Sequence, residues 1–248
     1  MPIPKSHPRY LSLKIRKQLV EAMEKGLVHE TGLIAHGRGE AFDYLLGEQT
    51  ISVANAASRV AAAALLYATH PVISVNGNVV SLCADECISL ANAIPATLEV
   101  NLFHRTNDRM VALAQELYKH GAKEVLGKKA SAHIPGLEHD RGLCDRKGIF
   151  SADVVLVPLE DGDRCHALAS MGKYVIAIDL NPLSRTAKTA PLTIVDNVTR
   201  ALPLIEQWAD QLKRKRKDEL KAIINQWDNI QMLGEVRSFI SKRLNSLV

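Results

Sequence analysis

Polar side chains follow three short apolar runs in the second half of the sequence. The runs span residues 154–157, 175–178 and 192–195, and the polar stretches after them span 160–164, 179–186 and 196–197. The Asp, Asn, Arg, Ser and Thr side chains of these stretches can bind the phosphates and the other polar groups of a nucleotide. Together the three stretches predict a ligand-binding site, and a nucleotide is the expected ligand.

The apolar runs predict the elements that position this site. Short runs rich in Val and Ile are typical of strands that are buried on both faces of a parallel sheet. Open α/β sheets bind ligands outside the carboxyl ends of their strands, because loops converge there and helix N-termini present free N–H groups. With further strands expected at 72–75 and 97–102, the sequence predicts an α/β fold whose mostly parallel sheet has helices on both faces.

A second set of polar residues follows the strands in the first half of the chain. Asn76, Gly77 and Asn78 come directly after the strand expected at 72–75. Their amides and backbone N–H groups could bind a polar ligand, although an ordinary tight turn would have the same sequence. Arg105 precedes a helix that Thr106 should cap, which is a favourable place to hold a phosphate.

A glycine-rich stretch, residues 31–47, carries His36, Arg38 and Glu40. Its glycines at 32, 37, 39 and 47 predict a loop whose backbone approaches a ligand and adopts positive φ angles, with a turn that leads into a short helix as the alternative. The stretch is not a P-loop, because Gly-x-x-x-x-Gly-Lys-Ser/Thr occurs nowhere in the chain.

Helical spacing of apolar residues predicts helices around the sheet. Residues 10–25 should form an amphipathic helix that ends at Gly26, and residues 51–69 a buried helix. The tail should contain two helices separated at Gly234 and pack on the body or on a partner subunit. We therefore expect a main domain at 1–212, with an N-terminal helical segment at 1–70, and a helical C-terminal extension at 213–248.

The segment 127–148 is charged and interrupted by Gly and Pro. Loops of this length inside compact domains are usually functional lids or binding loops. His133 and His139 lie six residues apart in it, with no third candidate ligand at a suitable spacing. We therefore interpret them as surface or substrate-contacting residues and not as metal ligands.

Several classes of protein are disfavoured by the composition. The chain contains no run of eighteen apolar residues and no signal-peptide core, so we expect a cytoplasmic protein without a membrane segment. The formal net charge is +4, and the basic run 213–217 lacks interleaved aromatic residues, which disfavours nucleic acid as a partner. No Gly-x-Gly-x-x-Gly follows a predicted strand, which disfavours a nicotinamide dehydrogenase.

Several long motifs together resemble one known family. They lie at residues 7–10, 32–47, 74–78, 99–103, 134–137, 152–164 and 176–187. These motifs resemble the archaeal phosphopantothenate synthetases, the 4-phosphopantoate–β-alanine ligases of coenzyme A biosynthesis, over residues 5–205. The resemblance implies a Rossmann-like homodimer that joins 4-phosphopantoate to β-alanine. It further implies that ATP and Mg²⁺ are used and that AMP and diphosphate are released through an acyl-adenylate.

The resemblance also implies positions for the ligands. By motif, it places ATP at Arg16, Arg38, Asp179, Leu180, Asn181, Arg185, Thr186, Asn197 and Val198. From the positions of the loops, we expect 4-phosphopantoate at His36, Asn76, Gly77, Asn78, Asn101, Arg105 and His133.

No catalytic residue and no metal ligand is assigned. Mg²⁺ should be held mainly by phosphates and water, with Asp161 or Asp163 as candidate partners, although we favour both as capping residues of the following helix. The alternative function is a non-catalytic Rossmann-like nucleotide-binding regulator. Such a regulator would not need the polar residues at 74–78, 101–105 and 133–139.

Overall fold

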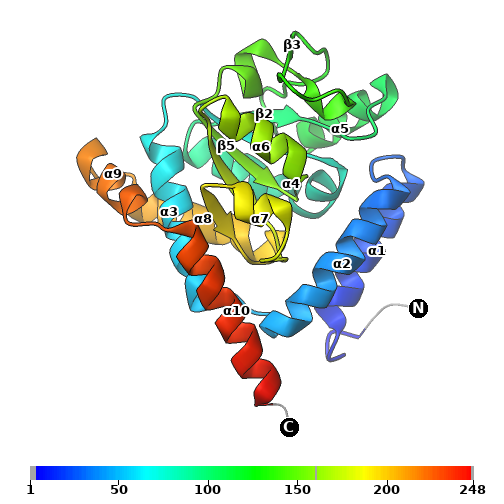
Figure 1. Cartoon of the computed structure of the whole chain (residues 1–248). Coiled ribbons are helices and arrows are strands. Elements are labelled where there is room, and N and C mark those ends of the chain that lie inside the picture. The colour runs from blue at the N-terminus through cyan, green and yellow to red at the C-terminus, as the bar shows by residue number, and fades with distance from the viewer. Residues whose placement is uncertain (1–3, 160, 247–248) are drawn as a thin grey trace.

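The computed structural model describes residues 4–159 and 161–246, and a five-stranded parallel sheet forms its centre (Figure 1). The strands are β1 (Pro71–Val75), β2 (Thr97–Val100), β5 (Val154–Pro158), β6 (Tyr174–Ile178) and β7 (Leu192–Ile194). Their order across the sheet is β2-β1-β5-β6-β7, and every neighbouring pair is parallel. The predicted α/β fold with a parallel sheet is confirmed. Because β2 lies on one side of β1 and β5 on the other, the strand order reverses between β1 and β5.

Side chains that alternate along the strands divide the core into two apolar clusters. Ile73, Leu156 and Ile176 belong to one cluster, whereas Val72 and Val155 belong to the other. All five side chains are fully buried. Each face of the sheet is covered, and for this reason the strand sequences are continuously apolar.

Helices cover the first of these faces, and a shorter helix with an irregular segment covers the second. The first cluster includes buried residues of α3 (Ser52–Tyr67), α4 (Gly77–Ala93), α5 (Asn107–Lys119) and α8 (Val198–Leu212). The second includes residues of α6 (Gly162–Ser170) and of the segment 127–150, which we call the excursion. The excursion contains the paired strands β3 (Ala132–His133) and β4 (Leu143–Cys144), and the turns η1 (Asp140–Gly142) and η2 (Arg146–Phe150). The short helix α7 (Arg185–Thr189) contacts α6 and β7.

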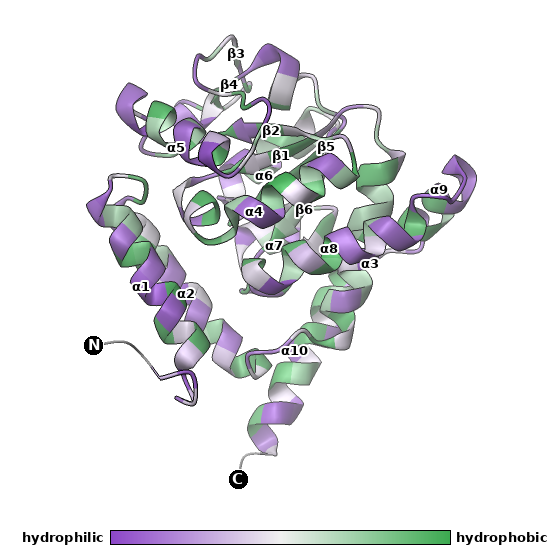
Figure 2. Ribbon diagram, turned by 180° about the vertical axis from the view of Figure 1, so that it is seen from behind, coloured by the Kyte–Doolittle hydropathy of each residue, from purple (hydrophilic) through white to green (hydrophobic). Residues whose placement is uncertain are grey.

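The N-terminal helices α1 (Tyr10–Glu24) and α2 (Glu30–Leu46) run side by side as a helical hairpin next to the sheet domain (Figure 2). The prediction of a loop at 31–47 is therefore wrong. Of its four glycines only Gly47, the C-cap of α2, has a positive φ, of 82°. Gly32 allows close packing within the protein, because a Cβ there would lie 2.4 Å from Oδ1 of Asn78. Tertiary packing has thus overridden the weak helix propensity of glycine.

The C-terminal tail packs on the body of the protein. Helix α9 (Lys217–Asn225) contacts α3, and α10 (Asn229–Asn245) contacts α2, α7 and β7. The predicted break at Gly234 is wrong, because Gly234 lies inside α10 and the helix begins after Asp228, whose side chain accepts a hydrogen bond from the Gln231 N–H. A strong N-cap thus decides the boundary. The division of the chain into domains at residue 213 stays a prediction.

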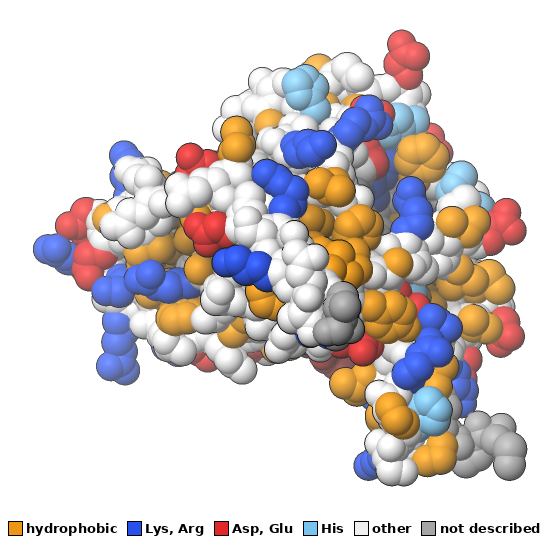
Figure 3. Space-filling view, turned by 60° about the horizontal axis from the view of Figure 1, so that its bottom comes forward, with side chains coloured by type: hydrophobic (Ala, Val, Ile, Leu, Met, Phe, Trp, Pro, Cys, Tyr) orange, Lys and Arg blue, Asp and Glu red, His pale blue; other side chains and the backbone are white. Residues whose placement is uncertain are grey.

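The basic run 213–217 is largely paired with carboxylates. Lys213 pairs with Asp210, Lys215 with Glu219, and Arg216 with both Asp218 and Glu219. Figure 3 shows blue and red side chains intermingled over this part of the surface. Within residues 4–159 and 161–246, no helix combines the length and the apolar character that a membrane crossing requires.

Candidate functional site

The carboxyl ends of β1 and β5 form the point where the strand order reverses. Asn76 follows β1, and its Nδ2 donates to the carbonyl oxygens of Pro158 (3.2 Å) and Leu159 (3.3 Å) after β5. Its Oδ1 accepts from the Val79 N–H and caps α4. Leu159 has a φ of 56°, which is unusual for a residue with a side chain. Ligands of open α/β sheets bind at such a point, so the candidate site lies here and along the adjacent ends of β6 and β7. Glu160, the first residue of the predicted polar stretch, lies outside the described residues.

The loop after β6 is a closed turn built on Asp179. The carboxylate of Asp179 accepts hydrogen bonds from the Asn181 N–H (2.9 Å) and from the Ser184 hydroxyl, and Ser184 in turn caps α7. Burial raises the pKa of Asp179, whereas these hydrogen bonds and the charge of Arg38 oppose the shift. Because Arg38 comes from α2, the hairpin and the β6 end face each other across the site.

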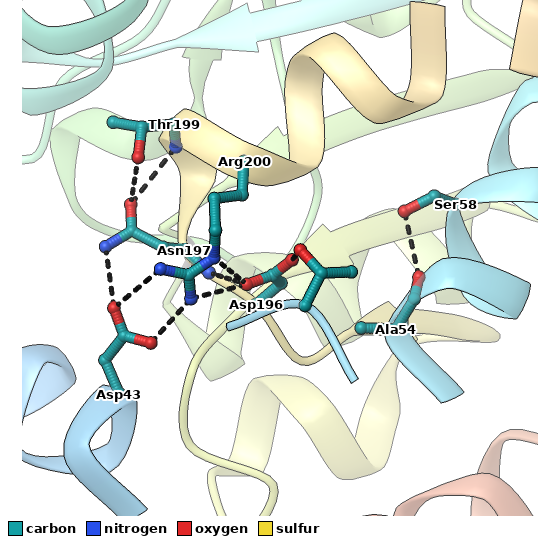
Figure 4. Close-up of polar contacts among 8 residues, drawn as sticks. Asp43, Ala54, Ser58, Asp196, Asn197, Thr199 and Arg200 are labelled. Carbon is teal, nitrogen blue, oxygen red and sulfur yellow. Dashed lines mark hydrogen bonds and ion pairs between the residues drawn. The ribbon is translucent and has the colours of Figure 1, made fainter. Parts of the chain in front are cut away.

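The loop after β7 is joined to α2 by a polar cluster (Figure 4). Asp43 of α2 accepts from Nδ2 of Asn197 (3.1 Å) and pairs with Arg200 (2.5 Å). Arg200 also pairs with Asp196 (2.6 Å), and the Asp196 carboxylate accepts from the Thr50 hydroxyl. Asn197 caps α8 through the Thr199 N–H. The cluster therefore fixes α2 against the start of α8.

A cavity of about 570 Å³ lies between the hairpin and the helices α4, α5 and α8. Of the predicted site residues, it brings His36 and Asn197 together, and Asp43 and Glu40 line the same space. Burial lowers the pKa of His36. The carboxylate of Glu40 is occupied by Arg16, which pairs with it at 2.6 Å and thereby has its own pKa raised.

The sequence did not single out Asp43 and Arg200. Asp43 could have been found had residues 31–47 been interpreted as a helix, because His36, Glu40 and Asp43 are spaced at i, i+4 and i+7, which places them on one helix face.

The residues after β1 hold the base of the hairpin. A Cβ on Gly77 would lie 2.3 Å from the Leu27 carbonyl oxygen, and Nδ2 of Asn78 donates to the Gly32 carbonyl at 2.9 Å. Both Gly77 and Asn78 are buried. The three residues 76–78 thus do not form an open loop but begin α4 and position the hairpin.

The predicted residues after β2 lie apart from the β6 and β7 ends. Asn101 is fully buried and donates to the carbonyl oxygens of Arg141 and Leu143 in the excursion. Arg105 is half-buried and donates through Nη2 to the Gly127 carbonyl oxygen, while its Nη1 is buried without a hydrogen-bond partner among the described residues. His133 is exposed on β3. Their role in substrate binding stays a prediction.

A buried arginine that the sequence did not indicate joins the excursion to the strand ends. Arg141 is only 5% exposed; its Nε donates to Asp161 (3.1 Å) and its Nη1 to the Asn101 carbonyl oxygen (3.2 Å). Asp161 also accepts from the Arg164 N–H at 2.8 Å, so its predicted capping role at α6 is confirmed. Asp163, in the first turn of α6, instead pairs with Arg185 at 3.1 Å, and both side chains are exposed.

Glu99 of β2 anchors the excursion from beneath. Its fully buried carboxylate accepts from the N–H groups of Asp145 (2.8 Å) and Ile149 (2.7 Å). A Cβ on Gly148 would lie 2.0 Å from this carboxylate, so only glycine allows the approach. Burial raises the pKa of Glu99 from 4.5 to about 7, although the two N–H groups oppose the shift.

The raised pKa of Glu99 makes stability depend on pH. Below the ordinary pKa the carboxyl is protonated in both the folded and the unfolded chain. As the pH rises from about 4.5 to about 7, the unfolded chain ionises first, so the contribution of this group to folding falls across that window. We expect denaturant unfolding to show the wild type losing stability relative to Glu99→Gln as the pH rises through the window. Parallel pH profiles of the two proteins would contradict this expectation.

These features define an α/β protein whose candidate ligand site lies across the carboxyl ends of a parallel sheet, with a helical hairpin beside it. Residues 53–243 match the model of a family described as phosphopantothenate/pantothenate synthetase. The chain is also 55% identical to the 4-phosphopantoate–β-alanine ligase of Thermococcus onnurineus (99% of this chain, 94% of that protein). It is 52% identical to the same-named protein of Methanosarcina mazei (99% and 96%) and 51% identical to that of Methanospirillum hungatei (98% and 98%). The chain therefore belongs to the phosphopantothenate/pantothenate synthetase family.

Proposed function

We propose that this protein is an ATP-dependent ligase that condenses 4-phosphopantoate with β-alanine, giving 4′-phosphopantothenate, AMP and diphosphate in coenzyme A biosynthesis. One observation carries the proposal: relatives at 51–55% identity over nearly their whole length are named 4-phosphopantoate–β-alanine ligases. Polar side chains at the strand ends, among them Asp179 and Asn197, support the proposal.

In this proposal ATP binds between α2 and the ends of β6 and β7. Support comes from the positions of Arg38 and Asp179, whose charges interact across this space, and of Asn197, which the Asp43–Arg200 cluster holds in place. The N-terminus of α8, capped by a neutral Asn side chain, adds a favourable field for an anion. Arg16 takes part through its exposed guanidinium edge while it stays paired with Glu40.

The proposed reaction has two steps. A carboxylate oxygen of 4-phosphopantoate attacks the α-phosphorus of ATP, the bond to the β-phosphate breaks, and diphosphate leaves. The free amine of β-alanine then attacks the acyl carbon, AMP leaves with the former carboxylate oxygen, and a proton is released. Charge neutralisation by arginines and correct positioning suffice for such chemistry, so a covalent enzyme intermediate is not needed.

We place 4-phosphopantoate between the point of strand reversal and the excursion. Arg105 supports this placement, because it has an unused buried N–H donor and lies next to the N-terminus of α5. A phosphate near Arg105 would satisfy that donor and benefit from the helix dipole. Asn101 and Arg141 then serve to fix the excursion over the substrate, since their hydrogen bonds join the excursion to β2 and α6.

Mg²⁺ is implied by the resemblance, and the residues present fit it. Magnesium keeps most of its water and is usually bound by phosphates and one or two carboxylates. Asp161 is engaged with Arg141 and with the α6 N-terminus, whereas Asp163 makes only an exposed ion pair with Arg185, which opens at little cost. Asp163 would therefore hold the ion, which would neutralise phosphate charge.

We further propose a homodimer in the cytoplasm, where ATP is available. The exposed apolar side chains of the hairpin support self-association, since Leu11 is 71% and Ile34 is 66% exposed. Light scattering coupled to size-exclusion chromatography should give twice the mass of the chain. A monomer at micromolar concentration would contradict the dimer.

An omission assay distinguishes the ligase from the alternative function, a regulator that binds a nucleotide without turnover. Purified protein, ATP, Mg²⁺, 4-phosphopantoate and β-alanine are combined, and each component is left out in turn. We expect AMP and 4′-phosphopantothenate to form only when all components are present. ATP binding without product formation would favour the regulator.

A further inference from the structure

Two walls of the proposed ATP site approach each other without a direct polar link. One wall is α2, which carries Arg38, and the other is the loop 179–185, which leads into α7. Between α2 and residues 179–185 the structure shows no hydrogen bond or ion pair. One apolar approach joins them, in which a Cβ on Gly39 would lie 3.4 Å from Leu180. The Asp43–Asn197–Arg200 cluster links α2 to the β7 end, but not to the loop 179–185. Helix α10 reaches both of these walls.

The start of α10 is attached to the second wall. Asn229, the first residue of this helix, is buried, and its Oδ1 accepts from the Thr193 N–H of β7 at 2.8 Å. Its Nδ2 donates to the carbonyl oxygen of Ala187 in α7, also at 2.8 Å. One side-chain amide therefore satisfies the free edge of β7 and ties α7 to it.

The far end of α10 is attached to the first wall. The guanidinium of Arg243 lies over Gly47, the C-cap of α2, so closely that a Cβ there would meet its Cζ at 2.9 Å. A positive charge at a helix C-terminus is favoured by the helix dipole. The left-handed glycine thus both ends α2 and leaves room for Arg243.

Helix α10 spans the distance between these two attachments. Its fourteen-residue separation from Asn229 to Arg243 corresponds to about 21 Å of rigid helix. Helix α10 contacts α7 and β7, and Figure 1 shows it passing beside the end of α2. Both walls of the site are therefore held by one element that lies outside the sheet.

We propose that α10 is a strut that sets the distance between the two walls of the ATP site, and that Asn229 and Arg243 are positioning residues for ATP. This inference rests on the proposed function. It assigns the C-terminal helix a specific role in nucleotide affinity beyond its contribution to folding, because a change at Arg243 should move α2, and Arg38 with it, relative to Asp179.

The test compares ATP affinity in variants of α10. Asn229→Ala removes two buried hydrogen bonds and can unfold the protein. The test therefore substitutes Arg243, which is partly exposed. We expect Arg243→Ala to raise the Kd for ATP and the KM for ATP about two- to fivefold, the range for loss of one favourable charge–dipole contact. The KM for 4-phosphopantoate should stay unchanged. Arg243→Lys should restore most of the affinity, and the neighbouring exposed Lys242→Ala is the matched control.

The outcomes distinguish a failure of the strut from a failure of the proposed ligase function. If the wild type binds ATP and Arg243→Ala binds it equally well, or if the KM values of both substrates change in parallel with the Tm, the strut is refuted while the ligase assignment stands. If the wild type binds no ATP, the proposed function fails and the strut fails with it.

Discussion

Replacing Arg38 by alanine is expected to lower kcat/KM for ATP by about 10²- to 10³-fold, the usual cost of removing a preorganised group that stabilises transition-state charge. Arg38 is exposed on α2 and forms no hydrogen bond or ion pair with other described residues, yet its charge acts on Asp179 at the β6 end. The side chain therefore contributes little to folding and is available for an anionic ligand. Steady-state kinetics with ATP as the varied substrate would measure the effect.

The controls for Arg38 separate charge from shape and from stability. Arg38→Lys keeps the charge but loses the planar guanidinium, so we expect partial activity. Arg214→Ala removes another exposed arginine of the same chain, far along the sequence, and should behave as the wild type. The Tm of Arg38→Ala should equal that of the wild type. Full activity of Arg38→Ala would show that Arg38 does not bind ATP.

Replacing Gly77 by alanine is expected to destabilise the protein by about 1–3 kcal/mol, the usual cost of overpacking a well-packed site. The added Cβ would lie 2.3 Å from the Leu27 carbonyl oxygen, which is a backbone atom and already accepts from Arg109 at 3.1 Å. The base of the hairpin must then move, and Arg38 moves with it. We therefore expect kcat/KM for ATP to fall by about tenfold or more as well. Urea unfolding and steady-state kinetics would measure the two effects.

Gly37→Ala is the matched stability control for Gly77→Ala. Gly37 lies in α2, and a Cβ there meets nothing within 4 Å. Alanine should stabilise the helix there by roughly 0.5–1 kcal/mol, because it loses less backbone freedom on folding. Equal stability changes in the two variants would show that the contact between Gly77 and Leu27 does not hold the hairpin.

The sheet could be predicted from the sequence because the residue pattern that specifies each strand lies within that strand. Strands buried on both faces must be short and continuously apolar, and β5, β6 and β7 show this pattern within five residues each. The polar stretches after these strands then follow from chain order alone. Where a single residue decides a boundary, as with the caps Thr106 and Asp161, the sequence also sufficed.

The hairpin and the excursion could not be predicted in the same way, because distant contacts decide them. Three glycines within α2 oppose a helix locally, and only the close approach of Asn78 to Gly32 explains one of them. Arg141 acquires its role from Asn101, forty residues earlier, and from Asp161, twenty residues later. Such pairings depend on how the excursion folds back on the strand ends, which no local spacing reveals.

The measurement that tests the central claim most directly follows the carboxylate oxygen of 4-phosphopantoate during ligation. 4-Phosphopantoate labelled with oxygen-18 in its carboxylate is incubated with the protein, ATP, Mg²⁺ and β-alanine, and the nucleotide and phosphate products are analysed by mass spectrometry. Attack on the α-phosphorus predicts AMP that carries one labelled oxygen and diphosphate without label. Labelled inorganic phosphate together with ADP would contradict the proposed adenylate and the contacts assigned to ATP.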